Sequence, residues 1–513
     1  MAVPPVVPGL LHERHGLDAA GQGRVLIEEL RCAWCHAGPV KRKLGPDLSG
    51  VGARVDAGFL RRFLLDPAEA DPGTQMPDVL AAVSVDEREA TADMLTHYLT
   101  SLSADKFSRA KVDGSMMGAG KKLFESVGCV TCHTPGQGVG LKHVPAKYGL
   151  DSLSAFLFQP HHSRPAGRMP DMNLTRDEAR SIAAFLLGTK ELKVAKLPPN
   201  PAKVAAGKAV FRSLNCTSCH KLPNQKSQLN MPMAELRTGR GCLAEQPDGV
   251  PDFHLSAFQR AAIGKALARI QKPLPDQLQV QHTMTAFNCI ACHTRDGAGG
   301  VSNAMFKHFG TDEEGLGNPG RIPPTLDGVG AKLRPEWLRK VLFDGAAVRP
   351  YMHTRMPQFG EANLRHLPGL FEKVDSLPVV ELPEPKREDR RRVREAGHLL
   401  VGDQGLNCVA CHNFNGKPSP GLKGVDLLNS FERLQPSWFA HFMRNPQKFR
   451  PGIVMPNFWP DGKAVRSDVL KGQTESQLQA LWYYFSLGRS ARDPSGIRAV
   501  GTDLVVSDRT RVY

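Results

Sequence analysis

One short pattern, Cys-x-x-Cys-His, constrains this sequence more than any other feature, because it recurs five times along the chain. The copies occupy residues 32–36, 129–133, 216–220, 289–293 and 408–412. They use ten of the eleven cysteines, namely Cys32, Cys35, Cys129, Cys132, Cys216, Cys219, Cys289, Cys292, Cys408 and Cys411. Each copy ends on a histidine: His36, His133, His220, His293 or His412. Any fold for this chain must therefore hold five pairs of thiols, each with an imidazole beside the second thiol.

This pattern is the attachment signature of a c-type haem. Two thiols on one helical turn can each form a thioether with a haem vinyl group, and the adjacent histidine then lies under the iron. Cys-x-x-Cys pairs also bind zinc or act as redox thiols. However, zinc would require two further Cys or His ligands for each pair, and a redox motif would follow a strand; neither feature is found in the sequence. We therefore predict five covalently attached haem c groups, with the motif histidines as iron ligands.

The length of the chain predicts several small domains. Its 513 residues provide about 100 residues for each motif. That is little for an independent hydrophobic core, but a buried porphyrin supplies apolar surface that side chains would otherwise provide. Each unit is therefore expected to fold around its haem.

A leading helix is predicted directly before the first three motifs, at residues 20–30 and around Gly120 and Gly207. Gly23, Gly120 and Gly207 each lie nine positions before the first cysteine of their motif. This fixed register indicates a repeat. A glycine at this place lets the leading helix approach another helix closely. The fourth leading helix, around residues 279–287, lacks the glycine.

A closing helix is predicted to end the units, at residues 87–99, 175–187, 256–267 and 474–487. Thr175 with Glu178, and Thr474 with Gln477, have the pattern of a capping box. The segment between a motif and its closing helix must cover the far side of the haem. The second ligand of each iron is expected there.

The first unit resembles a class I cytochrome c in this distal segment. The resemblance rests on Gly45-Pro46-Asp47-Leu48, on Gly50-Val51-Gly52, on Asp66-Pro67 and on Met76-Pro77 before a closing helix. It extends through short motifs over most of residues 14–488. It implies an all-α fold in which a few helices wrap each haem, and a methionine whose sulfur lies opposite the motif histidine. Carried over to this sequence, it implies four such ligands: Met76, Met169, Met356 and Met455. The nearest alternatives are Met352, His161 and His162.

We therefore expect five tandem cytochrome c-like domains, at residues 14–104, 114–190, 202–271, 278–377 and 390–488. The fourth carries an insertion at residues 295–321. The tail at residues 489–513 is expected to begin a further β-rich region.

The third unit departs from the pattern, because Val250 stands where the ligand methionine is expected. Val250-Pro251-Asp252 aligns with Met169-Pro170-Asp171. This haem therefore either lacks a sixth ligand or takes one from elsewhere. His254 and the unpaired Cys242 are the first candidates, and Met231 and Met233 also carry donor atoms. An empty position would admit small ligands.

The net charge of +15 would fall to about +5 once ten haem propionates are added. Lysine and arginine are scattered, apart from clusters at residues 41–43 and 386–392. We therefore expect no nucleic-acid partner, but redox partner proteins with acidic surfaces.

No apolar run is long enough to span a bilayer, and residues 1–8 lack the features of an export signal. Haem attachment to such motifs takes place outside the cytoplasm, so we expect a periplasmic or other extracytoplasmic location. The export signal is then expected to have been removed, or the chain to be a segment of a longer protein.

These features favour an electron carrier, with five haems on one chain that pass single electrons between redox partners. The first alternative is an oxidoreductase with chemistry at the third haem, such as peroxidase-like turnover or sulfur-compound oxidation, because that unit lacks the methionine and carries Cys242. A second alternative is the electron-transfer module of a larger dehydrogenase or surface protein. Side-chain catalysis is not required for the carrier, so no catalytic residue is assigned.

Overall fold

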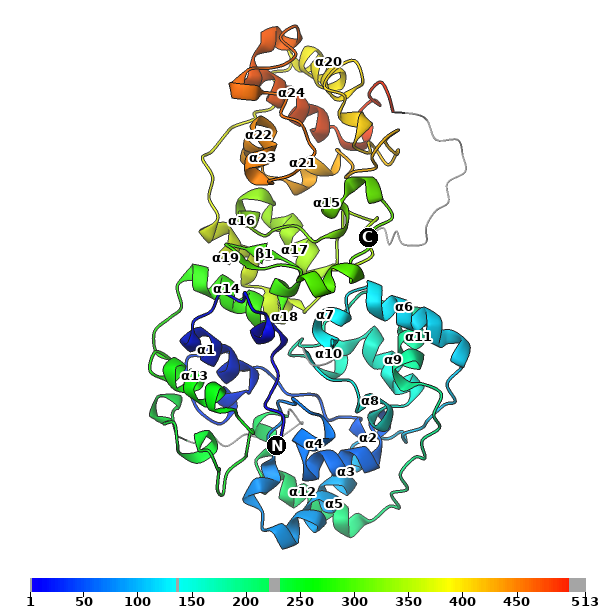
Figure 1. Cartoon of the computed structure of the whole chain (residues 1–513), viewed down its shortest axis with the longest axis vertical. Helices are drawn as coiled ribbons and strands as arrows, with labels where there is room; N and C mark the ends of the chain where they lie inside the picture. The colour runs from blue at the N-terminus through cyan, green and yellow to red at the C-terminus, as the bar shows by residue number, and fades with distance from the viewer. Residues whose placement is uncertain (1, 135–137, 221–230, 498–513) are drawn as a thin grey trace. The chain divides into compact units, whose positions relative to one another are not determined.

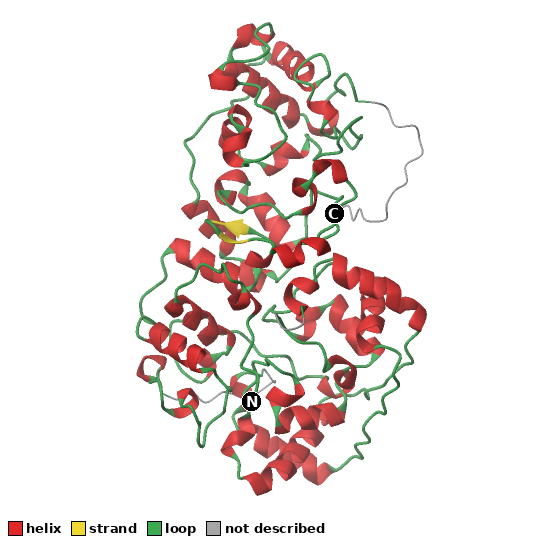
Figure 2. Cartoon of the chain, viewed as in Figure 1, coloured by secondary structure: helices red, strands yellow, loops and turns green. Residues whose placement is uncertain are grey.

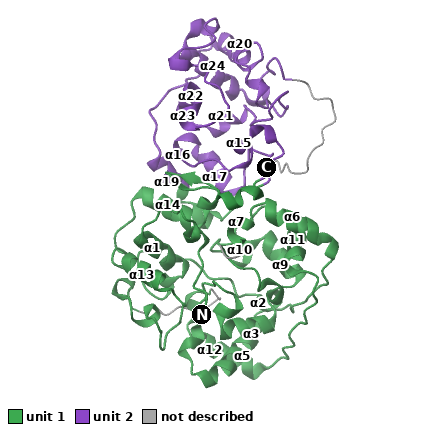
Figure 3. Cartoon of the chain, viewed as in Figure 1, with its two compact units in different colours: residues 1–309, 354–367 green, residues 310–353, 368–513 purple. Residues whose placement is uncertain are grey.

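A computed structural model describes residues 2–134, 138–220 and 231–497 of the chain. It divides into two compact units (Figure 3). Unit 1 comprises Met1–Phe309 and Thr354–Leu367, and unit 2 comprises Gly310–His353 and Pro368–Tyr513. The predicted fourth domain, 278–377, is therefore shared between the two units. Residues 498–513 of the tail, in which a further β-rich region is expected to begin, lie outside the described residues.

Helices and loops make up nearly all of the described chain (Figures 1 and 2), which agrees with the predicted all-α class. The two named strands of the described residues, β1 (Thr294–Arg295) and β2 (Ala298–Gly299), form one antiparallel pair. They lie at the start of the predicted insertion.

The longer helices of unit 1 are α1 (Ala19–Glu29), α3 (Ala57–Leu65), α5 (Val85–Ser101), α6 (Met117–Ser126), α9 (Leu150–Phe158), α11 (Arg176–Leu187), α12 (Pro201–Ser213), α13 (Ala257–Leu267) and α14 (Asp276–Ala286). Those of unit 2 are α17 (Pro335–Phe343), α20 (Arg390–Val401), α22 (Pro436–Arg444) and α24 (Thr474–Ser486), while α19 (Leu367–Val374) begins at the boundary between the units. Single-turn helices are α2 (Val51–Arg54), α4 (Pro67–Ala70), α7 (Val130–His133), α8 (Val144–Lys147), α10 (Pro160–Ser163), α15 (Asn318–Arg321), α16 (Val329–Lys332), α18 (Glu361–Leu364), α21 (Asn429–Arg433) and α23 (Pro446–Phe449).

The helix starts follow local capping chemistry. Thr175 and Glu178 form the predicted capping box at the start of α11. The second predicted capping box is wrong. Thr474 is itself the first residue of α24, and the Gln477 side chain is fully buried, donates to the carbonyl oxygen of Val469 and accepts from the indole N–H of Trp459. That side chain is therefore already satisfied inside the core.

Four pairs of the longer described helices cross at a glycine. A Cβ atom built on Gly23 would lie 1.9 Å from the carbonyl oxygen of Ala262, and one on Gly120 would lie 1.9 Å from that of Ser181. The corresponding distance is 2.1 Å between Gly207 and Met94, and 2.4 Å between Gly397 and Ala480. The first three glycines are those of the predicted register. Only a residue without a side chain allows such close backbone contact.

The partners in these crossings divide into two kinds. In the segments 114–190 and 390–488 the leading helix packs on the closing helix of the same segment, as α6 does on α11 and α20 on α24. In unit 1, however, α1 packs mainly on α13, and α12 packs mainly on α5. Each leading helix therefore meets the closing helix of the other segment, which is not the pairing that the boundaries 14–104 and 202–271 predict.

The hydrophobic cores follow the same pairing. One cluster of unit 1 joins Val25 and Leu26 of α1 to Ile263 of α13. A second cluster contains both Leu95 of α5 and Phe211 of α12, together with the core of residues 114–190. The core of unit 2 is rich in aromatic residues, with Trp459 and Tyr484 fully buried.

The Gly120 crossing yields a test with a matched control. We expect Gly120→Ala to lower the free energy of unfolding by about 1–3 kcal/mol, because its new methyl group would clash with the carbonyl group of Ser181. Gly118→Ala in the same helix meets no heavy atom within 4 Å and should be neutral or stabilise by up to about 1 kcal/mol. Denaturant unfolding of both variants measures the difference. Equal effects of the two substitutions would contradict the close crossing.

Candidate haem-binding sites

The five motifs adopt nearly the same turn. The residue before the first cysteine has a positive φ in every motif: 63° at Arg31, 116° at Gly128, 53° at Asn215, 56° at Asn288 and 55° at Asn407. A short helical turn follows, and the histidine backbone N–H bonds to the carbonyl oxygen of the first cysteine at 2.9–3.1 Å. Asparagine and glycine tolerate this conformation best. Sequence reasoning missed this signal, although it lies beside each motif.

The ring of the motif histidine is fixed by a backbone carbonyl group. The Nδ1 atom lies 2.9 Å from the oxygen of Met231 in His36, and 3.1 Å from that of Val139 in His133. It lies 2.9 Å from Pro46 in His220, and 2.9 Å from Val425 in His412. A carbonyl oxygen only accepts hydrogen bonds, so Nδ1 must carry the proton. The Nε2 lone pair is then left to bind a metal ion.

None of the eleven cysteines, all of which lie in the described residues, forms a disulfide. Burial raises the pKa of Cys129, Cys216, Cys289 and Cys408 to about 12. Among the described residues, no group of three or more His, Cys, Asp or Glu side chains is arranged to hold a metal ion. Thiols beside a free imidazole Nε2 are the groups that thioether attachment and iron ligation require, so the motif residues fit haem c.

Two pairs of motifs lie in contact within unit 1. The Asn288 amide, directly before the fourth motif, donates to the carbonyl oxygen of Thr131 at 3.3 Å and approaches the sulfur of Cys132 at 3.3 Å. The backbone N–H of Gly45, which follows the first motif, donates to the carbonyl oxygen of Cys219 in the third motif at 2.8 Å. The first and third motifs are thus neighbours, and so are the second and fourth. Haems attached there would lie close together.

The distal segments also meet in pairs. Asp78 and Asp252 exchange two backbone hydrogen bonds, of 2.8 and 3.0 Å, in an antiparallel bridge. Asp171 and Gln358 form the same bridge, with two bonds of 2.8 Å. In each strand the bridge residue lies two positions after the predicted ligand site. These sites are Met76, Met169, Met356 and, without a donor atom, Val250.

A buried carboxylate supports two of the predicted methionine ligands. Glu29 of α1 is 1% exposed and pairs with Lys43. Its Oε2 atom accepts from Gln75 at 3.2 Å and lies 3.1 Å from Nε of Arg168. Gln75 and Arg168 directly precede Met76 and Met169. Burial acts to raise the pKa of Glu29, but Lys43 and Arg168 outweigh it and lower the pKa to about 2.

The predicted ligands otherwise lie as follows. Met76 and Met169 pack against a core cluster of unit 1, and Met455 against the core of unit 2. Cys242 packs with Cys32 in the cluster that contains α1 and α13. His254 lies 3.1 Å from Asp252 and has a φ of 49°. The two residues expected near the third motif therefore belong to the segment that packs on the first.

Unit 2 contains a cluster of half-buried cations that sequence reasoning missed. Lys332, Arg349, Arg433 and Arg450 lie close enough to influence one another. Burial, together with the charges of Arg433, Arg349 and Arg450, lowers the pKa of Lys332 to about 7. Arg433 also acts on His412, whose pKa is lowered first by burial. A cluster of partly buried cations is stable only when anions pair with it. The propionates of a haem at the fifth motif would supply such anions.

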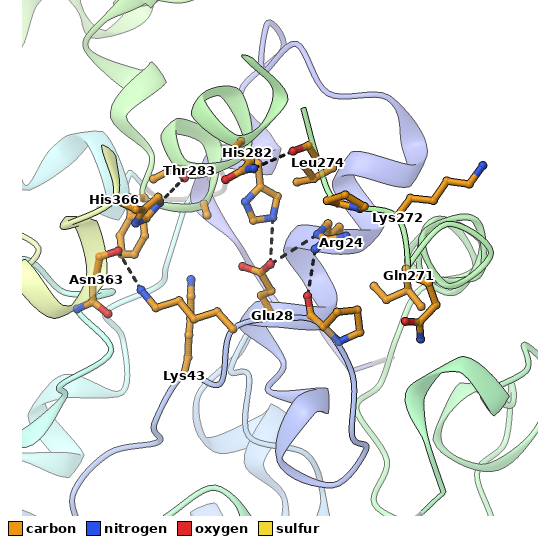
Figure 4. Close-up of a pocket in the computed structure, with 17 residues that line it drawn as sticks. Arg24, Glu28, Lys43, Gln271, Lys272, Leu274, His282, Thr283, Asn363 and His366 are labelled. Atoms are coloured by element: carbon orange, nitrogen blue, oxygen red, sulfur yellow. Dashed lines mark hydrogen bonds and ion pairs between the residues drawn. The ribbon is translucent and has the colours of Figure 1, made fainter. Parts of the chain in front are cut away.

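A separate cavity of about 370 Å³ lies between α1, α14 and the α18 segment (Figure 4). Glu28 faces Arg24 at 3.9 Å and His282 at 3.7 Å, while Thr283 contacts His366 at 3.1 Å. Burial lowers the pKa of His282 and of His366. None of the predicted haem ligands lines this cavity.

A helical fold with Cys-x-x-Cys-His turns of this geometry defines the class of proteins that carry covalently bound haem c. The family model for cytochrome c matches residues 118–190. This segment contains the second motif, Met169 and α11. The chain therefore contains a cytochrome c domain, which implies a covalently bound haem c and electron transfer.

The curated relatives support the same class. The chain is 36% identical over 76 residues to the cbb3-type cytochrome c oxidase subunit CcoP of Helicobacter pylori strain 26695, and 34% identical over 76 residues to that of strain 52. The matches cover 15% of this chain and about a quarter of each relative, 26% and 25%. No solved structure matches the chain. Within the described residues, no helix combines the length and the apolar character needed to cross a bilayer.

The Glu29 network predicts a specific pH dependence. The pKa of Glu29 in the folded state lies below its ordinary value, so the ionised carboxylate stabilises the fold above that value, and this contribution is lost as the pH falls toward 2. We expect Glu29→Gln to lower the free energy of unfolding at pH 7 by about 3–5 kcal/mol, because it leaves buried cations unpaired. The variant should also lose less stability than the native chain between pH 5 and 2.

Denaturant unfolding across that pH range tests this expectation. The control is Glu89→Gln, because Glu89 pairs with Arg61 at the surface and contributes at most about 1 kcal/mol. If the stability of Glu29→Gln depended on pH in the same way as that of the native chain, the carboxylate would not stabilise the fold as described.

Proposed function

We propose that this chain is a pentahaem c-type cytochrome that carries single electrons between redox partners outside the cytoplasm. The observation that carries the proposal is that all five motifs share one turn. In the four motifs whose Nδ1 contact is described, that contact leaves the Nε2 lone pair to bind a metal ion. The cytochrome c match at residues 118–190 supports the same chemistry for one of them.

The contacts between motifs support a carrier rather than five isolated sites. Gly45, which follows the first motif, donates to the carbonyl oxygen of Cys219, and the Asn288 amide lies 3.3 Å from the sulfur of Cys132. Haems attached to neighbouring motifs would bring their edges close enough for fast electron exchange. The protein then contributes ligation, insulation and spacing. Met76, Met169, Met356 and Met455 are proposed as the sixth ligands that hold four of the haems at relatively high potential.

The charged segments of the chain do not favour a nucleic-acid partner. Lys43 is buried against Glu29. Arg390, Arg391 and Arg392 pair with Glu384, Glu395 and Asp389. Carboxylates thus pair with one basic residue of the first cluster and with three of the second. Redox proteins with acidic docking surfaces remain the proposed partners.

A second candidate function is small-ligand chemistry at one haem. It is favoured by Val250, which stands two positions before Asp252 of the bridge with Asp78. The other three residues in the two bridges between distal segments each have a methionine at that place. An open iron position there would bind carbon monoxide in the ferrous state. Turnover of peroxide or of a sulfur compound would favour the enzyme. Complete lack of turnover would favour the electron carrier instead.

Substitution of Met169 tests the proposed ligation in the domain that the cytochrome c family model matches. We expect Met169→Leu to remove about one quarter of the far-red sulfur-to-iron absorption band of the ferric protein. We expect Met169→His to lower the potential of one haem by more than about 100 mV, since imidazole replaces a thioether.

The control is Met172→Leu. Met172 is a core residue of the same segment, 4% exposed, and is not a proposed ligand. That variant should keep the full band. A full band in Met169→Leu as well would exclude Met169 as a ligand.

A further inference from the structure

The first and third motifs obtain their carbonyl contacts from each other's sequence segments. His36 bonds to the carbonyl oxygen of Met231, which follows the third motif. His220 bonds to that of Pro46, which follows the first motif. Two backbone hydrogen bonds connect the same segments. The N–H group of Gly45 donates to the carbonyl oxygen of Cys219 at 2.8 Å, and that of Met233 donates to the carbonyl oxygen of Ala37 at 2.8 Å.

The second and fifth motifs show the unexchanged arrangement. His133 bonds to Val139, and Val139 donates back to Cys132 at 2.8 Å. His412 bonds to Val425, and the neighbouring Gly424 donates back to Cys411 at 2.9 Å. In both, the segment that holds the histidine continues into the predicted methionine and the closing helix. The holding segment therefore identifies the distal half that covers the same haem.

The helix crossings point to the same exchange independently. Gly207 of α12 crosses Met94 of α5, and Gly23 of α1 crosses Ala262 of α13. Residues 45–101 thus supply the histidine contact and the closing helix of the third motif, and they pack against its leading helix α12. The first motif is completed by residues 231–267.

We propose that the first and third haem sites are formed by exchanged halves of the chain, so that Met76 ligates the haem attached to Cys216 and Cys219, opposite His220. The haem attached to Cys32 and Cys35, bound by His36, lies under the segment that carries Val250 and has no methionine ligand. This inference rests on the proposed function, since it assigns ligands to two of the five haems. It reverses the assignment that sequence order gives.

The other methionines near the first motif do not supply the missing ligand. Met231 presents its carbonyl oxygen to Nδ1 of His36, on the histidine side of the site. Met233 is fully buried, and its sulfur lies 3.0 Å from a Cβ built on Gly38, directly after the motif. The first haem is therefore the one that binds an added ligand.

Two variants of the full chain distinguish the assignments. Cys216→Ser with Cys219→Ser removes the third haem, and Cys32→Ser with Cys35→Ser removes the first. The exchanged arrangement predicts that loss of the third haem removes about one quarter of the far-red sulfur-to-iron band and leaves carbon monoxide binding at one haem. Loss of the first haem should leave the band intact and abolish carbon monoxide binding.

The opposite pattern, with the band reduced when the first haem is lost, would overturn the exchange. Intact-mass measurement on the same samples must show one haem fewer than the native chain. A native chain without haem would instead overturn the proposed function itself, so the two failures are distinguishable.

An experimental structure of the native chain that resolves the iron ligands answers the same question without variants that must fold. Met76 sulfur on the iron tethered to Cys216 and Cys219 would support the exchange. Met76 sulfur on the iron tethered to Cys32 and Cys35 would contradict it.

Discussion

The hydrogen bond between a motif histidine and a backbone carbonyl group is the interaction on which the rest of this structure depends. It fixes the tautomer of the ring, and therefore determines which nitrogen is available to iron. At His36, His133, His220 and His412 it also connects the Cys-x-x-Cys-His turn to the segment that supplies the carbonyl group. Where that segment follows the same motif in sequence, as at His133 and His412, the unit is self-contained. At His36 and His220 the segment that supplies the carbonyl group follows the other motif instead. The segments after the first and third motifs are therefore exchanged.

The buried carboxylate of Glu29 also connects separate segments of unit 1. Glu29 lies on α1, while the side chains that contact it come from residues 43, 75 and 168. One carboxylate thus connects the leading helix of the first motif to the residues before two predicted methionine ligands. Such a buried ion pair is costly to break because the remaining charges would stay unpaired. Electrostatics and helix packing therefore act together to position the loops that carry Met76 and Met169.

The sequence predicted local structure well because local structure depends on nearby residues. The closing helices expected at 175–187 and 474–487 correspond to α11 (Arg176–Leu187) and α24 (Thr474–Ser486), and the glycine register gave three of the four close crossings. The pairing of helices could not be predicted in this way. Gly23 and Gly207 have the same offset from their cysteines, so either closing helix suits either leading helix. Glu29 was missed because its burial depends on Lys43 and Arg168, which are distant in sequence.

The account as a whole depends on ten thiols that bind five haems. The most direct measurement is the intact mass of the denatured chain together with its iron content, because thioether-bound haem stays attached when the fold is lost. The account predicts five haems and five irons per chain. A chain that carries haem only within residues 118–190, or that holds zinc in place of haem at the other motifs, would contradict it.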